Sequence, residues 1–261
     1  MKDFRIRCSA IGNIMAGTIG LTDKQLDTIK TLEDKAWDRT EKQEITLNDL
    51  IRKRDNLELP EGAKTYCKDW LKGQLFDYKK VLKNKFIDKG NIMEDESIDF
   101  ICDQLGLGFL LKNEEYFRDA YMHGTPDIIL KDLIIDAKNS WDCSTFPFFD
   151  ETVNSDYYWQ LQGYMHLTGR PKAKLIYCLM DTPEHLIYKE ARYYSMSLGH
   201  EDLEERIYED FKRNMTYQNV PDKLKIKVID IDKNNNDIAQ IMTRVEMCRE
   251  YIEQLKSEIN N

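Results

Sequence analysis

Short apolar runs bounded by polar turn residues predict the β-strands of this chain. The clearest prediction is a β-hairpin over residues 127–138, in which two apolar runs flank the dipeptide Lys131-Asp132. Further apolar runs predict strands at residues 173–180 and 224–231. The hairpin comes first, and the two other predicted strands follow it along the chain.

Apolar residues spaced three and four positions apart predict helices around these strands. The helices are expected at residues 4–16, 92–105, 157–167, 201–215 and 238–259. Residues 22–89 are also predicted to be mainly helical, with a break at the turn that Pro60 and Gly62 indicate. Ser9 is expected to cap the first helix. Helices that precede, separate and follow a few strands predict an α/β or α+β domain with one central sheet.

The composition is typical of a globular protein. The chain has 261 residues, of which 41% are hydrophobic and 33% are charged, enough apolar material for a buried core. Neither a bilayer-length apolar run nor the apolar segment of a signal peptide occurs. The six cysteines stand singly without a CxxC pair, which argues against a zinc ribbon, an iron–sulfur cluster or a disulfide scaffold. We therefore expect a cytoplasmic protein with no membrane partner.

The charge of the chain is uneven. A net charge of −9 argues against nucleic-acid binding by the surface as a whole. Residues 62–90 are an exception, because they are rich in lysine, and Lys64, Lys68 and Lys72 recur at every fourth position with aromatic residues between them. On a helix these lysines form one stripe, which is either a track for a phosphate backbone or a solvated face whose aromatics lie in the core.

The predicted hairpin carries an unusual group of charged residues. Asp127 opens its first strand, and Asp136 and Lys138 lie two positions apart in its second strand. These two therefore point to the same face, while Ala137 points to the other. Strand interiors disfavour Asp and Lys, so such a group needs a reason. A divalent cation between the carboxylates is one such reason; a turn cap at Asp127 and a structural Asp136–Lys138 ion pair are the alternatives.

Four short motifs occur in a fixed order around this hairpin: a Gly-x-x-x-Glu pair, a Pro-Asp pair, an Asp-x-Lys triplet and a Gln-x-x-x-Tyr pair. They are Gly90…Glu94, Pro126-Asp127, Asp136-Ala137-Lys138 and Gln160…Tyr164. In this order and spacing the chain resembles the PD-(D/E)xK nuclease superfamily, and within it the exonucleases of the phage lambda and YqaJ-like viral recombinase type. The segment Arg7-Cys8-Ser9-Ala10 also looks similar to the Thr-Ala-Ser-like segment with which that family often begins.

The resemblance implies a fold. A restriction-endonuclease-like core has a central mixed β-sheet flanked by helices, and this chain adds a helical N-terminal insert. One nuclease domain would then cover residues 1–261. Its helical part would span about residues 22–90, its catalytic core about 90–180, and its C-terminal strand and helices about 181–261.

The resemblance also implies a metal centre. Glu94, Asp127 and Asp136, with the backbone carbonyl of Ala137, would hold Mg²⁺, two ions in all, with Mn²⁺ as a substitute. A hard divalent cation takes several oxygen ligands, and this donor set supplies them. Glu96 competes with Glu94 for the first position, and we favour Glu94 because of its distance from Gly90.

Further residues would complete the chemistry. Lys138 would orient the attacking water or neutralise charge that develops on the phosphate. Gln160 would bond that water or a phosphate oxygen, with Tyr164 as its brace; a surface or capping role is the alternative for Gln160. DNA contacts are expected at Arg5, Arg7, Ser9, Lys64, Lys68, Lys72 and Tyr164.

The function implied is a magnesium-dependent deoxyribonuclease, an exonuclease that hydrolyses phosphodiester bonds from linear duplex DNA ends in phage-type recombination. The resemblance further implies the host cytoplasm, a single-strand annealing protein as partner, and a homo-oligomer. Two alternatives are a PD-(D/E)xK endonuclease and a catalytically silent DNA-binding module of the same fold.

Overall fold

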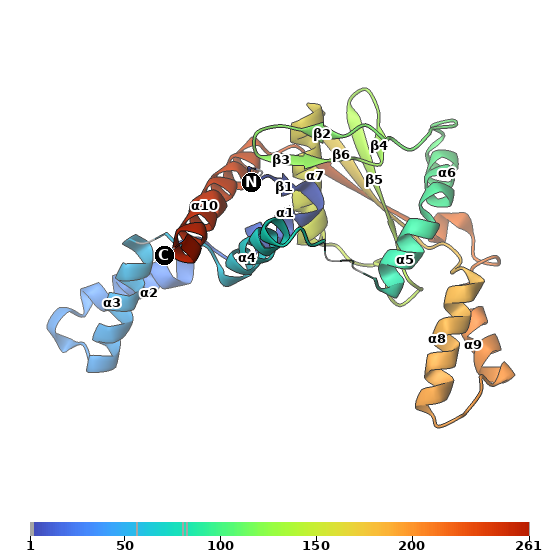
Figure 1. Cartoon of the computed structure of the whole chain (residues 1–261), viewed down its shortest axis with the longest axis horizontal. Coiled ribbons are helices and arrows are strands. Elements are labelled where there is room, and N and C mark those ends of the chain that lie inside the picture. Colours follow the sequence, from blue (N-terminus) through green and yellow to red (C-terminus); the bar gives the residue numbers. More distant parts are fainter. Residues whose placement is uncertain (1–2, 56, 80, 82, 261) are drawn as a thin grey trace. The chain divides into compact units, whose positions relative to one another are not determined.

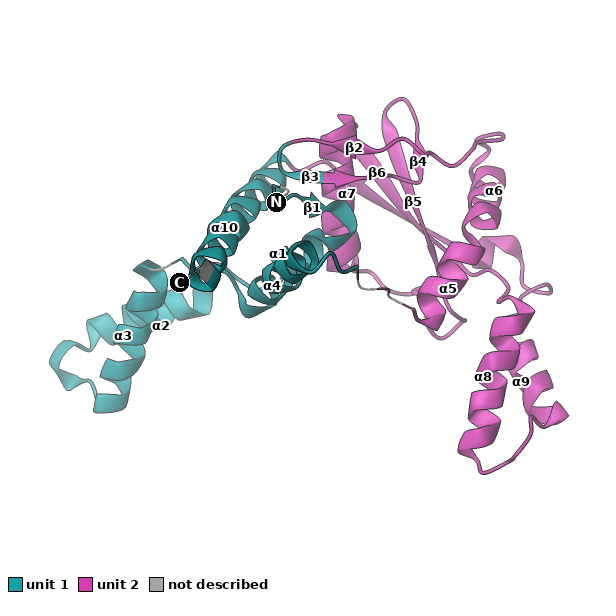
Figure 2. Ribbon diagram, viewed as in Figure 1, with its two compact units in different colours: residues 1–79, 120–122, 235–261 teal, residues 80–119, 123–234 magenta. Residues whose placement is uncertain are grey.

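The computed structural model describes residues 3–55, 57–79, 81 and 83–260 (Figure 1). They form two compact units, drawn in different colours in Figure 2. Unit 1 comprises Met1–Lys79, Ala120–Met122 and Asn235–Asn261, and unit 2 comprises Lys80–Asp119 and His123–Asn234. The single-domain organisation expected from the sequence stays a prediction. In the described part of the chain, no helix is both long enough and apolar enough to cross a membrane.

Unit 2 contains a four-stranded mixed sheet, which confirms the predicted fold class. Its strands in spatial order are β4 (Ile128–Ile129), β5 (Leu133–Asn139), β6 (Lys172–Cys178) and β7 (Ile226–Asp232). β4 pairs antiparallel with β5, β5 parallel with β6, and β6 antiparallel with β7. The predicted hairpin is β4–β5, with Ile128 opposite Ile135.

Helices cover both faces of β5, because its side chains alternate between two cores. Ile135 and Ala137 belong to a cluster with Ile98 and Ile101 of helix α6 (Glu94–Leu105). The opposite face of the strand lies against α7 (Ser155–Thr168), in agreement with the helix predicted at residues 157–167. This alternation directs Asp136 toward α7. The candidate site lies on this face of the strand.

Several boundaries differ from the predictions. The helix expected at residues 92–105 is α6, and a separate helix, α5 (Lys85–Ile92), precedes it. Gly90 lies inside α5, because the Asn84 side chain accepts a bond from the Ile87 N–H and caps a new helix there. Strand β7 follows a short 3₁₀ turn, η3 (Asp222–Leu224).

The helix predicted at residues 201–215 is α9 (Glu205–Met215), and it packs against α8 (Glu184–Ser197), a helix that was not predicted. Trp141, Leu186, Ile187 and Met215 form the buried core of this pair. Strands β2 (Phe117–Arg118) and β3 (Met122–Gly124) pair antiparallel, with Arg118 opposite His123.

In unit 1, α4 (Glu61–Leu75) packs against α10 (Asn235–Asn260), and α1 (Ile11–Met15) contacts both. The helical region is interrupted near Pro60 as predicted, since Pro60 is the N-cap of α4. The predicted helix over residues 238–259 corresponds to α10.

The prediction for residues 4–16 was partly wrong. They form strand β1 (Ile6–Arg7), a 3₁₀ turn η1 (Cys8–Ala10) and only then α1. Ser9 lies within η1 and does not cap a helix. The physical reason is a long-range bond: the Ile6 N–H donates to the Tyr121 carbonyl at 2.9 Å, which holds this segment extended.

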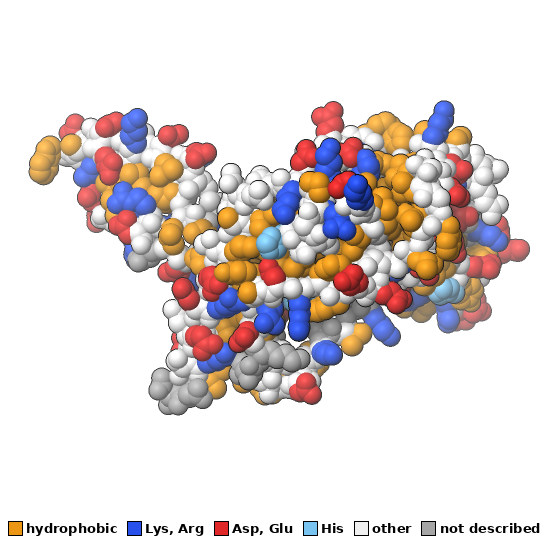
Figure 3. Space-filling model, turned by 90° about the horizontal axis from the view of Figure 1, so that it is seen from above, with side chains coloured by type: hydrophobic (Ala, Val, Ile, Leu, Met, Phe, Trp, Pro, Cys, Tyr) orange, Lys and Arg blue, Asp and Glu red, His pale blue; other side chains and the backbone are white. Residues whose placement is uncertain are grey.

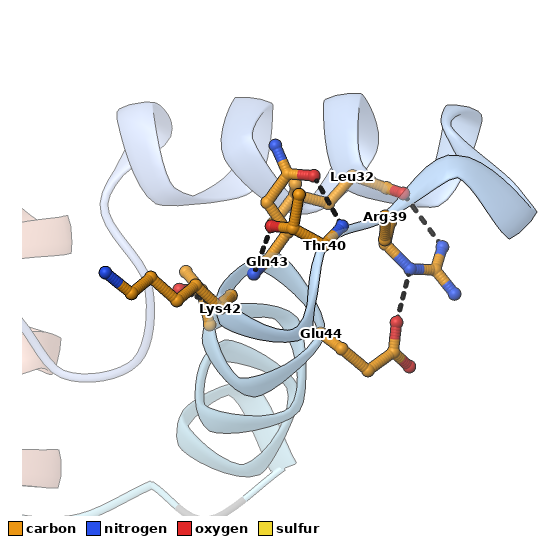
Figure 4. Close-up of polar contacts among 7 residues, drawn as sticks. Leu32, Arg39, Thr40, Lys42, Gln43 and Glu44 are labelled. Carbon is orange, nitrogen blue, oxygen red and sulfur yellow. Dashed lines mark hydrogen bonds and ion pairs between the residues drawn. The ribbon is translucent and has the colours of Figure 1, made fainter.

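Unit 1 also carries a helical hairpin made of α2 (Asp23–Asp34) and α3 (Glu41–Asp55), joined through the 3₁₀ turn η2 (Ala36–Asp38). Arg39 fixes the connection, because its Nη1 donates to the Leu32 carbonyl at 2.9 Å and its Nε bonds Glu44 at 2.6 Å (Figure 4). Ile29, Leu32 and Leu47 form a small core between the helices.

Candidate active site

The β4–β5 hairpin brings two carboxylates and an ammonium group together. Asp127 directly precedes β4, and its Oδ2 accepts a hydrogen bond from the Ala137 N–H of β5 at 2.8 Å. Asp136 is fully buried, and its Oδ2 forms an ion pair with the Lys138 ammonium on the same face of β5. The structure therefore places three of the predicted site residues side by side, with the Ala137 backbone between them.

Helix α7 completes this group from above the sheet face. Gln160 is buried, and its Nε2 donates to Asp136 Oδ1 at 3.0 Å and to the Tyr164 hydroxyl at 3.2 Å. The bond to Tyr164 forms because Gln160 and Tyr164 are four residues apart and share one helix face. Tyr164 is only 5% exposed, so it contacts Gln160 as a brace and offers little surface to DNA.

Glu94, the first residue of α6, lies at the edge of this group. Its Oε2 is 2.5 Å from Nζ of Lys112, and its negative charge is one of the charges that raise the pKa of Asp127. Glu96, the competing residue, is exposed. Glu94 is thus close enough to Asp127 to act on it electrostatically, while the Glu94 carboxylate is paired with Lys112.

The electrostatics of the group follow from burial and crowding. Burial, and then the neighbouring charge of Asp136, raise the pKa of Asp127 to about 7, although Lys138 and the Ala137 N–H act against this. Burial works to lower the pKa of Lys138, but the charges of Asp136 and Asp127 outweigh it and raise that pKa. The site therefore holds more negative charge than its own lysine neutralises.

The two aspartates fit a divalent cation. Asp136 Oδ2 is buried, and its partner among the residues that the structure describes is the Lys138 ammonium group. A bound cation would supply the missing charge and use that oxygen. Among these described residues, however, no three His, Cys, Asp or Glu side chains are close enough to hold a metal ion together. Glu94 is engaged by Lys112 and does not join the two aspartates in the present arrangement.

Solved structures provide the comparison. The chain is similar to a phage-related exonuclease from Haemophilus somnus 129PT, with 25% identity and a TM-score of 0.67 over 99% of this chain and 97% of that one. This chain thus has the fold of that exonuclease. An alkaline exonuclease from Laribacter hongkongensis has the same fold, with 13% identity and a TM-score of 0.57 over 98% of this chain and 93% of that one. The latter protein has also been solved in complex with dAMP.

Sequence comparisons add nothing to this. No family model matches the chain, and a search of curated proteins finds no match. The fold therefore carries the relationship, and the assignment of the four short motifs stays a prediction.

Two lysines of unit 2 escaped the sequence predictions. Lys112 lies in the loop between α6 and β2, and Lys89 is fully buried in α5, where Nζ donates to the carbonyls of Trp141 at 2.8 Å and Met180 at 2.7 Å. Their partners are distant in sequence, and no local pattern indicates them. Tyr157 was also missed; its ring lies 4.9 Å from Nζ of Lys138, and its position three residues before Gln160 on α7 could have indicated it.

The predicted DNA-contacting lysines all lie on α4 in unit 1 of this exonuclease fold. Lys64 bonds Glu58 at 2.9 Å and Glu61 at 3.1 Å, and Lys72 lies 3.7 Å from Asp69. Lys68 is exposed. On the face drawn in Figure 3, Lys and Arg side chains are interspersed with Asp and Glu side chains. Neighbouring acids thus partly neutralise the stripe, and its role in DNA binding stays a prediction.

The N-terminal candidates also belong to unit 1. Arg7 and Ser9 are exposed. Arg5 lines a cavity of about 350 Å³ together with Trp70 and Arg249. Its Nε atom is buried and has no hydrogen-bond partner within the described part of the chain. The contact of Arg5 with a terminal phosphate stays a prediction.

Replacing Asp127 with asparagine should stabilise the protein above pH 7. The folded state raises the pKa of this carboxyl from 3.8 to about 7, so it holds a proton that the unfolded chain has already released. Stability therefore falls as pH rises from about 4 to 7, and the neutral amide removes that fall. We expect Asp127→Asn to gain about 1–2 kcal/mol at pH 8 and little at pH 4 in urea unfolding with a chelator present. Equal stability of Asp127→Asn and the unmodified protein at pH 8 would show that the ionised Asp127 carboxylate does not destabilise the folded state.

Proposed function

We propose that this protein is a divalent-metal-dependent exonuclease that hydrolyses phosphodiester bonds from the ends of duplex DNA. The main support is the group formed by Asp127, Asp136 and Lys138 on one hairpin, within a fold shared over nearly its whole length with a phage-related exonuclease. Mg²⁺ is the expected ion, with Mn²⁺ as a substitute, and the family resemblance implies two ions.

Each residue has a part in the proposed reaction. Asp127 and Asp136 would hold the cation, with Glu94 joining them once Lys112 releases it. Bound Mg²⁺ would polarise the scissile phosphate and lower the pKa of a coordinated water. Lys138 lies against Asp136 and would neutralise charge that develops on the phosphate.

For Gln160 we propose a positioning role beside the expected contact with the attacking water or a phosphate oxygen. Its amide already donates to Asp136 and Tyr164, so we propose that it fixes the orientation of the Asp136 carboxylate. A carboxylate held in place by a neighbouring amide keeps its oxygens directed at the ion, as hydrogen bonds to metal ligands commonly do.

The biological role proposed is recombination of the phage type. The Haemophilus somnus relative is described as phage-related, and the Laribacter hongkongensis relative has been solved with dAMP, a DNA mononucleotide. A single-strand annealing protein as partner and a homo-oligomer around DNA remain proposals that rest on the family resemblance.

Linear and covalently closed circular duplexes test this function. With Mg²⁺, the protein should degrade end-labelled linear DNA and leave the closed circle intact, and a chelator should stop the reaction. Cleavage of the circle would instead indicate an endonuclease. Loss of neither substrate, with DNA still bound, would indicate a silent binding module. Duplexes with 5′-phosphate and 5′-hydroxyl ends, labelled at each end in turn, would give the polarity.

A further inference from the structure

Lys112 pairs with Glu94, the residue expected as one of the metal ligands. It lies in the loop between α6 and β2, and its Nζ is 2.5 Å from Glu94 Oε2. The pair is only partly exposed, at 37% for the lysine and 29% for the glutamate. The ammonium group therefore stands beside the predicted acidic centre rather than in open solvent.

Other acids of the site also act on Lys112. Burial works to lower the pKa of this lysine. The bond to Glu94 and the negative charges of Glu94, Asp127 and Asp95 outweigh burial, so the pKa of the lysine is raised. The Lys112 ammonium group thus partly neutralises the negative charge at Glu94. The Lys138 ammonium group does the same at Asp136.

We propose that Lys112 competes with a divalent ion for Glu94, and that such an ion must displace its ammonium group from Glu94 in order to bind. The inference rests on the proposed function and adds a residue that sets the affinity of the site for its ion. It explains why Glu94 pairs with Lys112 and does not group with Asp127 and Asp136 among the described residues. A partly exposed ion pair is weak enough for a divalent ion to replace.

The chain offers a matched control. Lys85 pairs with Glu190 at the same N–O distance of 2.5 Å, and its side chain is 36% exposed, against 37% for Lys112. Lys85 also lies in unit 2 but bonds an acid of α8. Removing either lysine deletes the same charge from a similar ion pair. Only Lys112 faces the acids that would bind the ion.

Calorimetric titration of the full chain with Mn²⁺ tests the inference. Lys112→Ala should tighten Mn²⁺ binding about three- to tenfold, because a competing positive charge is gone. Lys85→Ala should change the Kd less than about twofold, since its charge lies elsewhere. Lys112→Arg keeps the charge and should bind Mn²⁺ about as the unmodified protein does. Thermal unfolding with a chelator would check that each variant is folded.

The Glu94→Gln background locates the effect. Without the glutamate charge, Lys112→Ala should no longer change the Mn²⁺ affinity, because the two substitutions act on one pair. Equal or weaker Mn²⁺ binding by Lys112→Ala would overturn the inference alone, provided that the unmodified protein binds Mn²⁺. Binding by Lys112→Ala but not by the unmodified protein would support it. Absence of Mn²⁺ binding in both would overturn the inference and the metal-dependent function together.

Discussion

Replacing Asp136 with asparagine should lower the rate of DNA hydrolysis by about a thousandfold or more while the protein stays folded. Asp136 is the most enclosed acid of the site, and its Oδ2 pairs with the Lys138 ammonium group. The amide is nearly the same size as the carboxylate, so packing against Gln160 is kept. It removes the negative charge that pairs with Lys138 and that a divalent ion would need.

The matched control for this variant lies on the same hairpin. Asp132 is exposed in the turn between β4 and β5, and Asp132→Asn should leave the hydrolysis rate within about twofold. Rates would be followed on linear duplex at saturating Mg²⁺. An Asp136→Asn protein that degrades DNA as fast as the control would remove this residue from the catalytic site.

Replacing Lys89 with methionine should destabilise the protein by about 2–4 kcal/mol at pH 7. Lys89 is fully buried in α5, and Nζ donates to the carbonyls of Trp141 and Met180, which follow β5 and β6. Methionine fills much of the same volume but leaves both carbonyls without this donor. The expected loss therefore comes from unsatisfied polar groups rather than from a cavity.

Urea unfolding would measure this loss, with Lys189→Met as the control. Lys189 is exposed on α8, so its replacement should change the free energy of unfolding by less than about 0.5 kcal/mol. Burial lowers the pKa of Lys89 to about 8, so the cost of burying its charge disappears as pH rises from about 8 toward 10.5. Equal stability of the two variants at pH 7 would contradict the prediction and show that the two buried bonds do not outweigh the cost of burying the Lys89 charge.

The part of the site carried by the hairpin could be predicted from the sequence. Strand alternation alone places Asp136 and Lys138 on one face and Ala137 on the other, and the structure has this arrangement. The spacing of four residues likewise brings Gln160 and Tyr164 together on α7. These relations are local, so periodicity is sufficient to predict them.

The remaining parts depend on contacts between distant segments. Lys112 meets Glu94 across 18 positions, and Lys89 meets the Met180 carbonyl across 91. Ser9 was expected to cap a helix, but the bond from Ile6 to the Tyr121 carbonyl holds the segment before it extended. No periodic pattern in the sequence reports such pairings, because they form only when the chain is folded.

Glu94 shows that prediction from the sequence is limited in the same way at the site itself. Its order relative to the two aspartates is visible in the sequence, and the structure brings it within electrostatic range of Asp127. Its partner Lys112 is not visible there, although the ion pair with Lys112 holds the Glu94 carboxylate. The sequence therefore shows the Glu94 carboxylate, whereas its ion pair with Lys112 could not be predicted.

Anomalous diffraction from a crystal soaked in Mn²⁺ would test most directly whether Asp127 and Asp136 form a metal centre. A manganese peak within about 2.5 Å of carboxylate oxygens from both residues, with Lys112 moved away from Glu94, is the expected result. Manganese bound only elsewhere on the protein, with both aspartates lacking a peak, would contradict metal-dependent catalysis at this hairpin.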